Sequence, residues 1–235
     1  MSDEIRRQFH IDLDHLKADI VHLGALAIET IPKATAALLA GDLSAAQILI
    51  DADDVIDVKS IAIEEESLRL MALQQPMARD LRALMTAVKL NWDIERSADL
   101  SVNICKAVRR IYGVTLPHNV RGAIEQMSEE AYRLTRLAVD AYLDLDVSIA
   151  SALDDMDDRL DALQVELMRA IFDAHEQDGL ELQPAVQLLR GRDVEHRDRL
   201  VVHIAEVVHL AAVDEHLVAI RDEGGAEPAL GDLQH

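Results

Sequence analysis

Two pairs of carboxylates have the spacing of a cation or proton site. Asp53 and Asp57 are four residues apart, and so are Glu95 and Asp99. In a helix, residues four apart lie on one face, so each pair would present two carboxylates side by side. Oxygen donors of this kind suit Mg, Ca, Mn or Fe better than soft metals. The four residues form a candidate metal site, with two solvated acidic helix faces as the alternative.

The two pairs can meet only if the helices that carry them are antiparallel neighbours. Gln75 and Pro76 mark a break between the two segments, and Pro76 suits the first turn of the second helix. A reversal of the chain between them places residue 95 opposite residue 56, and residue 99 opposite residue 52. Four carboxylates at one level repel one another unless they face water, share protons or bind a cation.

The segment around the first pair is duplicated. Residues 37–57 and 141–161 are identical at 10 of 21 positions without a gap, at an offset of 104. A second similarity, at an offset of 100, relates the segment that begins at Asp93 to the one that begins at Asp193. The chain is therefore predicted to be a tandem repeat: a first copy over 1–114, a second over 115–222 and a flexible tail over 223–235.

The second copy differs at the candidate site. Asp157, Asp161 and Glu195 repeat three of the four carboxylates, but Arg199 stands at the position of Asp99. Our hypothesis is that this guanidinium supplies a fixed positive charge in place of a cation. We therefore expect any cation site in the first copy only.

Composition and breaks predict an all-α fold. Half of the residues are apolar but only 3% are aromatic, and Gly and Pro are scarce. Apolar residues recur at intervals of seven or eight residues, as a buried helical stripe requires. Ser44 and Ser148 follow the matched breaks and are expected to cap the next helices. The prediction is six helices of roughly 25 to 40 residues, arranged as two antiparallel three-helix bundles.

Charge and motifs exclude several functions. The net charge of −21 argues against direct nucleic-acid binding, which depends on neutralising phosphates. Every run of about 18 apolar residues is interrupted by charge, so no membrane span is expected. A single cysteine and no signal-peptide pattern indicate the cytoplasm. Since phosphate-binding loops, nucleophile elbows and Cys/His clusters are missing, we expect no enzymatic activity.

One stretch resembles a known family. It reads Leu73-Gln74-Gln75-Pro76, then Ala78, Asp80-Leu81-Arg82, Asp93-Ile94-Glu95-Arg96 and Asp99. This is similar to the QxPxAxDLR and ERxxD motifs of the PhoU family of phosphate-uptake regulators. The resemblance extends over roughly residues 5 to 220 and implies the duplicated three-helix architecture.

The resemblance also implies a function. Family members are regulators that repress phosphate-starvation responses through a phosphate ABC transporter and a sensor histidine kinase, and they reach the membrane only through these partners. Some bind iron or other metals through E/DxxxD motifs, which here implies Asp53, Asp57, Glu95 and Asp99 as ligands. Two alternatives stay open: a metal-storage or metalloenzyme bundle, and a helical module that binds a basic partner. Apolar helix faces would also permit a homodimer.

Overall fold

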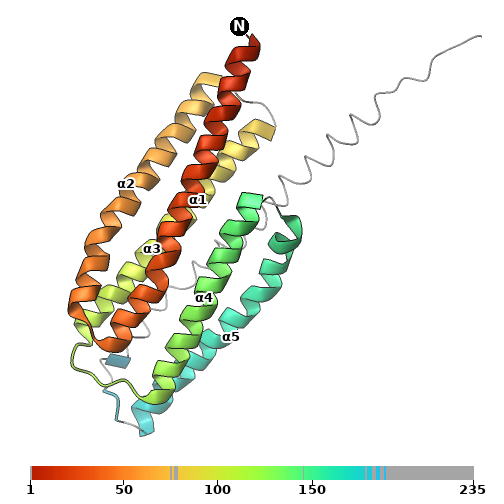
Figure 1. The fold of residues 1–235 in the computed structure, drawn as a ribbon. Coiled ribbons are helices and arrows are strands. Elements are labelled where there is room, and N and C mark those ends of the chain that lie inside the picture. Colours follow the sequence, from red (N-terminus) through yellow and green to blue (C-terminus); the bar gives the residue numbers. More distant parts are fainter. Residues whose placement is uncertain are drawn as a thin grey trace, which may run out of the picture.

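The computed structural model describes residues 2–74, 76, 79–144, 146–177, 179–181, 184, 185 and 188. These residues form five helices, listed in chain order: α1 (Ser2–Ala40), α2 (Leu43–Gln74), α3 (Arg79–Arg110), α4 (His118–Asp144) and α5 (Val147–Gln177). Each helix runs antiparallel to the one before it (Figure 1). The all-α prediction is confirmed. Of the expected sixth helix only residues 184, 185 and 188 are described, and the tail over 223–235 lies outside the described residues.

Helix α1 is the central element. It packs against α2 and α3 of its own copy and against α4 of the second copy, while α4 packs against α5 (Figure 1). By length and composition alone, Arg6–Ala40 could cross a membrane, which the sequence analysis did not anticipate. Half of its most apolar window is buried inside the bundle. A helix surrounded by three others needs an apolar surface on most sides, and this position accounts for its composition.

The two copies share one core. Each of the five helices contributes at least one fully buried leucine to one cluster, among them Leu23, Leu70, Leu90, Leu134 and Leu153. Burying a side chain of this size contributes roughly 1.5–3 kcal/mol. The first copy is therefore stabilised by apolar contacts with the second.

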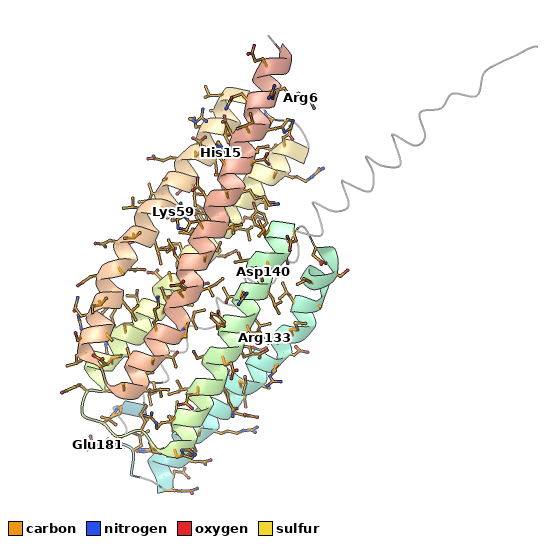
Figure 2. All side chains as sticks on the ribbon, in the orientation of Figure 1. Arg6, His15, Lys59, Arg133, Asp140 and Glu181 are labelled. Atoms are coloured by element: carbon orange, nitrogen blue, oxygen red, sulfur yellow. The ribbon has the colours of Figure 1, made fainter. Side chains whose placement is uncertain are left out.

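Local contacts set how closely the helices lie. A Cβ built on Gly24 would meet Val139 Cγ2 at 2.9 Å, so this glycine permits the close contact of α1 with α4. Between α1 and α2, Lys59 Nζ lies 2.8 Å from Asp19 Oδ1, on the side of α2 that faces α1 (Figure 2). A glycine therefore allows α1 and α4 to approach closely, and an ion pair links α1 to α2.

The turn between α1 and α2 is a Schellman motif followed by an aspartate cap. Gly41 has φ of 63°, and Asp42 N donates to Ala37 O at 2.9 Å, which satisfies a free carbonyl at the end of α1. Asp42 Oδ1 then accepts hydrogen bonds from the backbone N–H groups of Ser44 and Ala45, both at 2.9 Å. Asp42 therefore caps α2, and the prediction that Ser44 does so is wrong.

The same device is repeated before α5. Asp146 N donates to Ala141 O at 3.0 Å, and Asp146 Oδ1 accepts from the N–H groups of Ser148 at 2.8 Å and Ile149 at 3.1 Å. Asp146, not Ser148, is the cap. The 104-residue offset of the sequence repeat therefore corresponds to a repeated backbone structure.

The caps give a stability prediction. Asp42→Ala and Asp146→Ala should each lower the free energy of unfolding by about 0.5–2 kcal/mol, because each leaves two N–H groups of the first turn without their carboxylate. Ser44→Ala and Ser148→Ala serve as matched controls and should change it by less than about 0.5 kcal/mol. Urea denaturation monitored by circular dichroism measures all four. Serine variants as destabilised as the aspartate variants would refute this assignment.

Candidate carboxylate site on α2 and α3

The pairing of α2 with α3 is marked by a buried amide. Asn91 of α3 is fully buried, and its Nδ2 donates to the carbonyl oxygen and to Oγ of Ser60 in α2, both at 3.0 Å. This contact places residue 91 opposite residue 60. It is the same register as the one predicted from a chain reversal between residues 75 and 76, which is thereby confirmed.

The start of α3 differs slightly from the prediction. The helix begins at Arg79, so Pro76 precedes it and does not occupy its first turn. Asp80 does lie in that turn, where a negative charge interacts favourably with the helix dipole. The last turn carries Arg109 and Arg110, whose positive charges interact favourably with the C-terminal end of the helix dipole. The helix that supplies Glu95 and Asp99 is thus well terminated at both ends.

The predicted carboxylates of the two helices lie close enough to affect one another's pKa. Asp53, Glu95 and Asp99 are half-buried, whereas Asp57 is exposed. Burial, together with the negative charges of Asp57 and Asp99, raises the pKa of Asp53 to about 6. Charges on α3 therefore act on a carboxylate of α2, as the spacing predicted.

The effect is mutual. The pKa of Glu95 is raised, first by burial and then by the charges of Asp99, Asp57 and Asp53. Since each helix raises the pKa of a carboxylate on the other, the four residues form one electrostatic cluster. We call Asp53, Asp57, Glu95 and Asp99 the carboxylate cluster.

Two cations partly neutralise the carboxylate cluster. Lys106 lowers the pKa of Asp53, and Arg96 lowers that of Glu95. Arg96 Nη1 also lies 3.6 Å from Asp99 Oδ2. Sequence reasoning missed Lys106, although it follows Asp99 by seven residues and therefore lies on the same helix face. Two positive charges against four carboxylates leave the cluster acidic.

The carboxylate cluster is not a preformed metal centre. Within the part of the chain that the structure describes, no three His, Cys, Asp or Glu side chains are grouped so as to hold a metal ion. The four carboxylates thus share an electric field without converging on one position. As placed, they do not fit a site with three or more protein ligands.

Of the four corresponding residues in the second copy, the structure describes only the side chain of Asp161. Asp161 is exposed on α5, and the side chain of Asp157 lies outside the description. Glu195 and Arg199 also fall outside the described residues. The replacement of a cation by Arg199 stays a prediction.

The single cysteine is a core residue. Cys105 is fully buried in an apolar cluster separate from the shared leucine core, with Val108 of the same helix and Ile111 just after the end of α3. Burial, together with the negative charge of Asp53, raises the pKa of its thiol to about 11. The thiol is therefore protonated at neutral pH and is a poor nucleophile.

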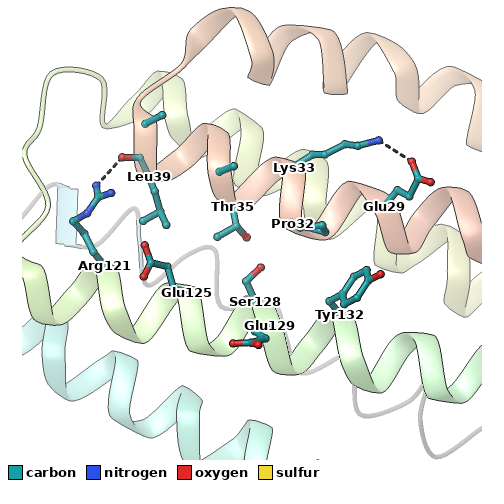
Figure 3. A pocket seen from close by; sticks show the side chains of 12 residues that line it. Glu29, Pro32, Lys33, Thr35, Leu39, Arg121, Glu125, Ser128, Glu129 and Tyr132 are labelled. Atoms are coloured by element: carbon teal, nitrogen blue, oxygen red, sulfur yellow. Dashed lines mark hydrogen bonds and ion pairs between the residues drawn. The ribbon is translucent and has the colours of Figure 1, made fainter.

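A groove lies on the surface where α1 of the first copy meets α4 of the second. It has a volume of about 700 Å³ and is lined by Pro32, Thr35 and Leu39 of α1 on one side and by Ser128 and Tyr132 of α4 on the other (Figure 3). At one end, Arg121 Nη1 donates to Leu39 O at 2.7 Å, which satisfies a carbonyl in the last turn of α1. Sequence reasoning found no signal for this groove, because its lining comes from two distant segments.

The raised pKa of Asp53 predicts how stability depends on pH. The pKa of an ordinary aspartate is 3.8, whereas the pKa of Asp53 in the folded protein is about 6. Between these values the folded state binds more protons than the unfolded state, so the free energy of unfolding falls as pH rises. Asp53→Asn removes this loss, so the variant should be more stable than wild type at pH 8, with a much smaller difference near pH 4.

Denaturation curves at several pH values measure this effect. Asp158→Asn, at an exposed position of α5, is the matched control and should show no such pH-dependent gain. A difference between Asp53→Asn and wild type that stays constant from pH 4 to pH 8 would contradict the electrostatic account.

Comparison with known sequences agrees with the motif analysis. The PhoU domain matches residues 20–108. A phosphate-specific transport system accessory protein PhoU homolog of Rhizobium meliloti is 26% identical over 230 residues, which cover 97% of both chains. The PhoU homolog 1 of Mycobacterium tuberculosis is 32% identical over 204 residues, which cover 86% of this chain and 90% of the relative.

Solved structures have the same fold. The phosphate transport system regulatory protein PhoU of Streptococcus pneumoniae superimposes with a TM-score of 0.74 at 25% identity, over 96% of this chain and all of that one. PhoU of Pseudomonas aeruginosa gives a TM-score of 0.76 at 21% identity, over 86% and 96% of the two chains. With the sequence matches, these similarities show that the chain belongs to the PhoU family.

Proposed function

We propose that this protein is a negative regulator of phosphate uptake and phosphate-starvation signalling. It acts without catalysis, as a cytoplasmic adaptor between the ATPase subunit of a phosphate ABC transporter and a sensor histidine kinase. The observation that carries the proposal is similarity along almost the whole chain to phosphate-specific transport system accessory proteins. A role connected with phosphate transport follows from these relatives, and the adaptor role is the finer step proposed here.

The physical properties of the molecule support an adaptor. Its long helices expose large apolar side chains, among them Trp92 and Phe172, that a binding partner could cover. Its one thiol is buried and protonated at neutral pH. The net charge of −21 disfavours contact with nucleic acid, so regulation of transcription would pass through a partner.

Deletion of the gene in the native host tests the regulatory role. With ample phosphate, a phosphate-responsive alkaline phosphatase reporter should be switched on in the deletion strain, because repression is lost. Reintroduction of the wild-type gene should silence it again. A reporter that stays silent after deletion would count against repression by this protein.

The adaptor role has its own test. The tagged protein should co-purify with the transporter ATPase and the kinase from cells grown in ample phosphate. Recovery of neither component, in high and in low phosphate, would contradict the adaptor role even if the reporter responds.

A second candidate function is cation binding at the carboxylate cluster. Mutual repulsion and burial raise the pKa values of Asp53 and Glu95, and a bound divalent or iron cation would relieve that repulsion. Because the side chains as placed do not converge, binding would require them to rotate. Under this alternative the bundle stores a metal or uses it in a reaction.

Metal analysis separates the two candidates. Purified wild-type protein should retain or bind a stoichiometric cation, and Glu95→Ala with Asp99→Ala should lose it because half of the ligands are gone. Asp158→Ala with Asp173→Ala, both exposed on α5, controls for the change in net charge. Full metal content in the Glu95/Asp99 double variant would rule out this site.

A further inference from the structure

One face of α3 is apolar and unusually exposed. Leu81, Met85, Val88 and Trp92 follow at intervals of four, three and four residues, so they lie along one face. Leu81 is 41% exposed, Met85 48% and Trp92 58%, while Val88 is half-buried. A stripe with this spacing is normally buried against a neighbouring element, but here three of its four members face solvent.

Helix α2 extends this face. Ile61 and Leu68 are 56% and 54% exposed, and they follow Asp57 by four and eleven residues, on nearly the same side of the helix. The register marked by Asn91 and Ser60 places residue 61 level with residue 90, and residue 68 level with residue 83. The apolar residues of α2 therefore lie at the levels of Trp92 and Met85.

Both helices continue from apolar residues into the carboxylate cluster. On α3, Glu95 and Asp99 follow Trp92 by three and seven residues. On α2, Asp57 precedes Ile61 by four. The result is one surface with an apolar end and an acidic end. We call it the α2–α3 surface, and its members are Asp57, Ile61, Leu68, Leu81, Met85, Trp92, Glu95 and Asp99.

Among the described helices, α2 and α3 pack only against α1 and each other in extensive contacts. Contiguous exposed apolar surface with polar flanks marks an interaction site on a soluble protein. Tryptophan, like tyrosine and arginine, is enriched among the residues that dominate binding energy. Trp92 beside the carboxylate cluster thus combines an apolar anchor with a source of charge specificity.

We propose that the α2–α3 surface binds a basic amphipathic helix of a protein partner. The apolar face of that helix packs on Trp92, Met85 and Ile61, and its Lys or Arg side chains pair with Asp57 and Asp99. This inference rests on the proposed function, since it names the chemistry by which the adaptor recognises a partner.

Charge complementarity selects this occupant. The carboxylate cluster has four acids against Arg96 and Lys106, and the whole chain has 44 acidic and 23 basic residues. A second copy of this chain would bring like charges together, which is unfavourable. A helix with anchors at i, i+4, i+7 and i+11 matches the apolar spacing, and basic flanks match the acidic end.

The only tryptophan of the chain lies in the proposed surface, so its fluorescence reports binding directly. The probe is a synthetic amphipathic peptide of about 18 residues with a leucine stripe, lysines elsewhere and no aromatic residue. Titration should shift the Trp92 emission to shorter wavelength in a saturable way. Salt should weaken the binding. A scrambled peptide of the same composition should not produce the shift.

Substitutions locate the contact. Asp57→Asn with Asp99→Asn should weaken binding about 3- to 10-fold, as expected for two partly exposed charge pairs. Asp158→Asn with Asp173→Asn removes the same net charge from α5 and should leave the affinity unchanged. Met85→Ala should weaken binding, whereas Phe172→Ala, at a position 54% exposed on α5, should not. Circular dichroism verifies that each variant is folded.

Several outcomes overturn the proposal. One is equal binding of the scrambled peptide, and another is equal weakening by the α5 control pair. A shift that appears with rising concentration of the protein alone would assign the surface to a second copy of the chain. If the peptide does not shift the Trp92 emission at all, the α2–α3 surface does not bind a basic helix.

The same variants distinguish failure of this inference from failure of the proposed function. If Met85→Ala loses peptide binding but still silences the phosphate reporter, the regulatory role stands and the surface is not the partner site. If the reporter is silent in the deletion strain, the regulatory proposal fails, and the peptide titration still decides whether the surface binds a basic helix.

Discussion

The carboxylate cluster and the α2–α3 surface depend on the register between α2 and α3. Asn91 is fully buried, and its amide donates two hydrogen bonds to Ser60 at 3.0 Å. A slip along the helix pair would leave that amide buried and unpaired, which costs about 1–3 kcal/mol. The same pairing brings Asp53 and Asp57 to the level of Glu95 and Asp99. One buried polar contact thus fixes which surface residues become neighbours.

The carboxylate cluster works against the stability of the fold that holds it. Deprotonation of Asp53 is opposed by burial and by neighbouring carboxylates, and Lys106 offsets only part of this cost. The core shared by the two copies, with a buried leucine from every described helix, can tolerate such a penalty. A cation or a basic partner bound at the carboxylate cluster, as proposed above, would relieve this repulsion.

Much of the fold, and the location of the candidate site, could be predicted from spacing alone. The repeat located the breaks, and carboxylates four residues apart located the α2–α3 face. The choice of Asp42 over Ser44 as a cap could not be predicted, because both residue types cap helices and the backbone decides between neighbours. The central position of α1 could not be predicted either, because it depends on the contact of α1 with α4 at Gly24 and Val139, which are distant in the sequence. Whether carboxylates converge on an ion depends on side-chain rotamers, which spacing does not encode.

The central claim is that carboxylates of two different helices act on each other, and the titration of Asp53 tests it most directly. Carbon-detected NMR of the side-chain carboxyl groups gives the pKa of Asp53 in wild type and in Asp99→Asn. We expect about 6 in wild type. In the variant we expect a lower value, still above 3.8 because burial remains. An ordinary aspartate pKa in wild type, or one that Asp99→Asn leaves unchanged, would contradict the account.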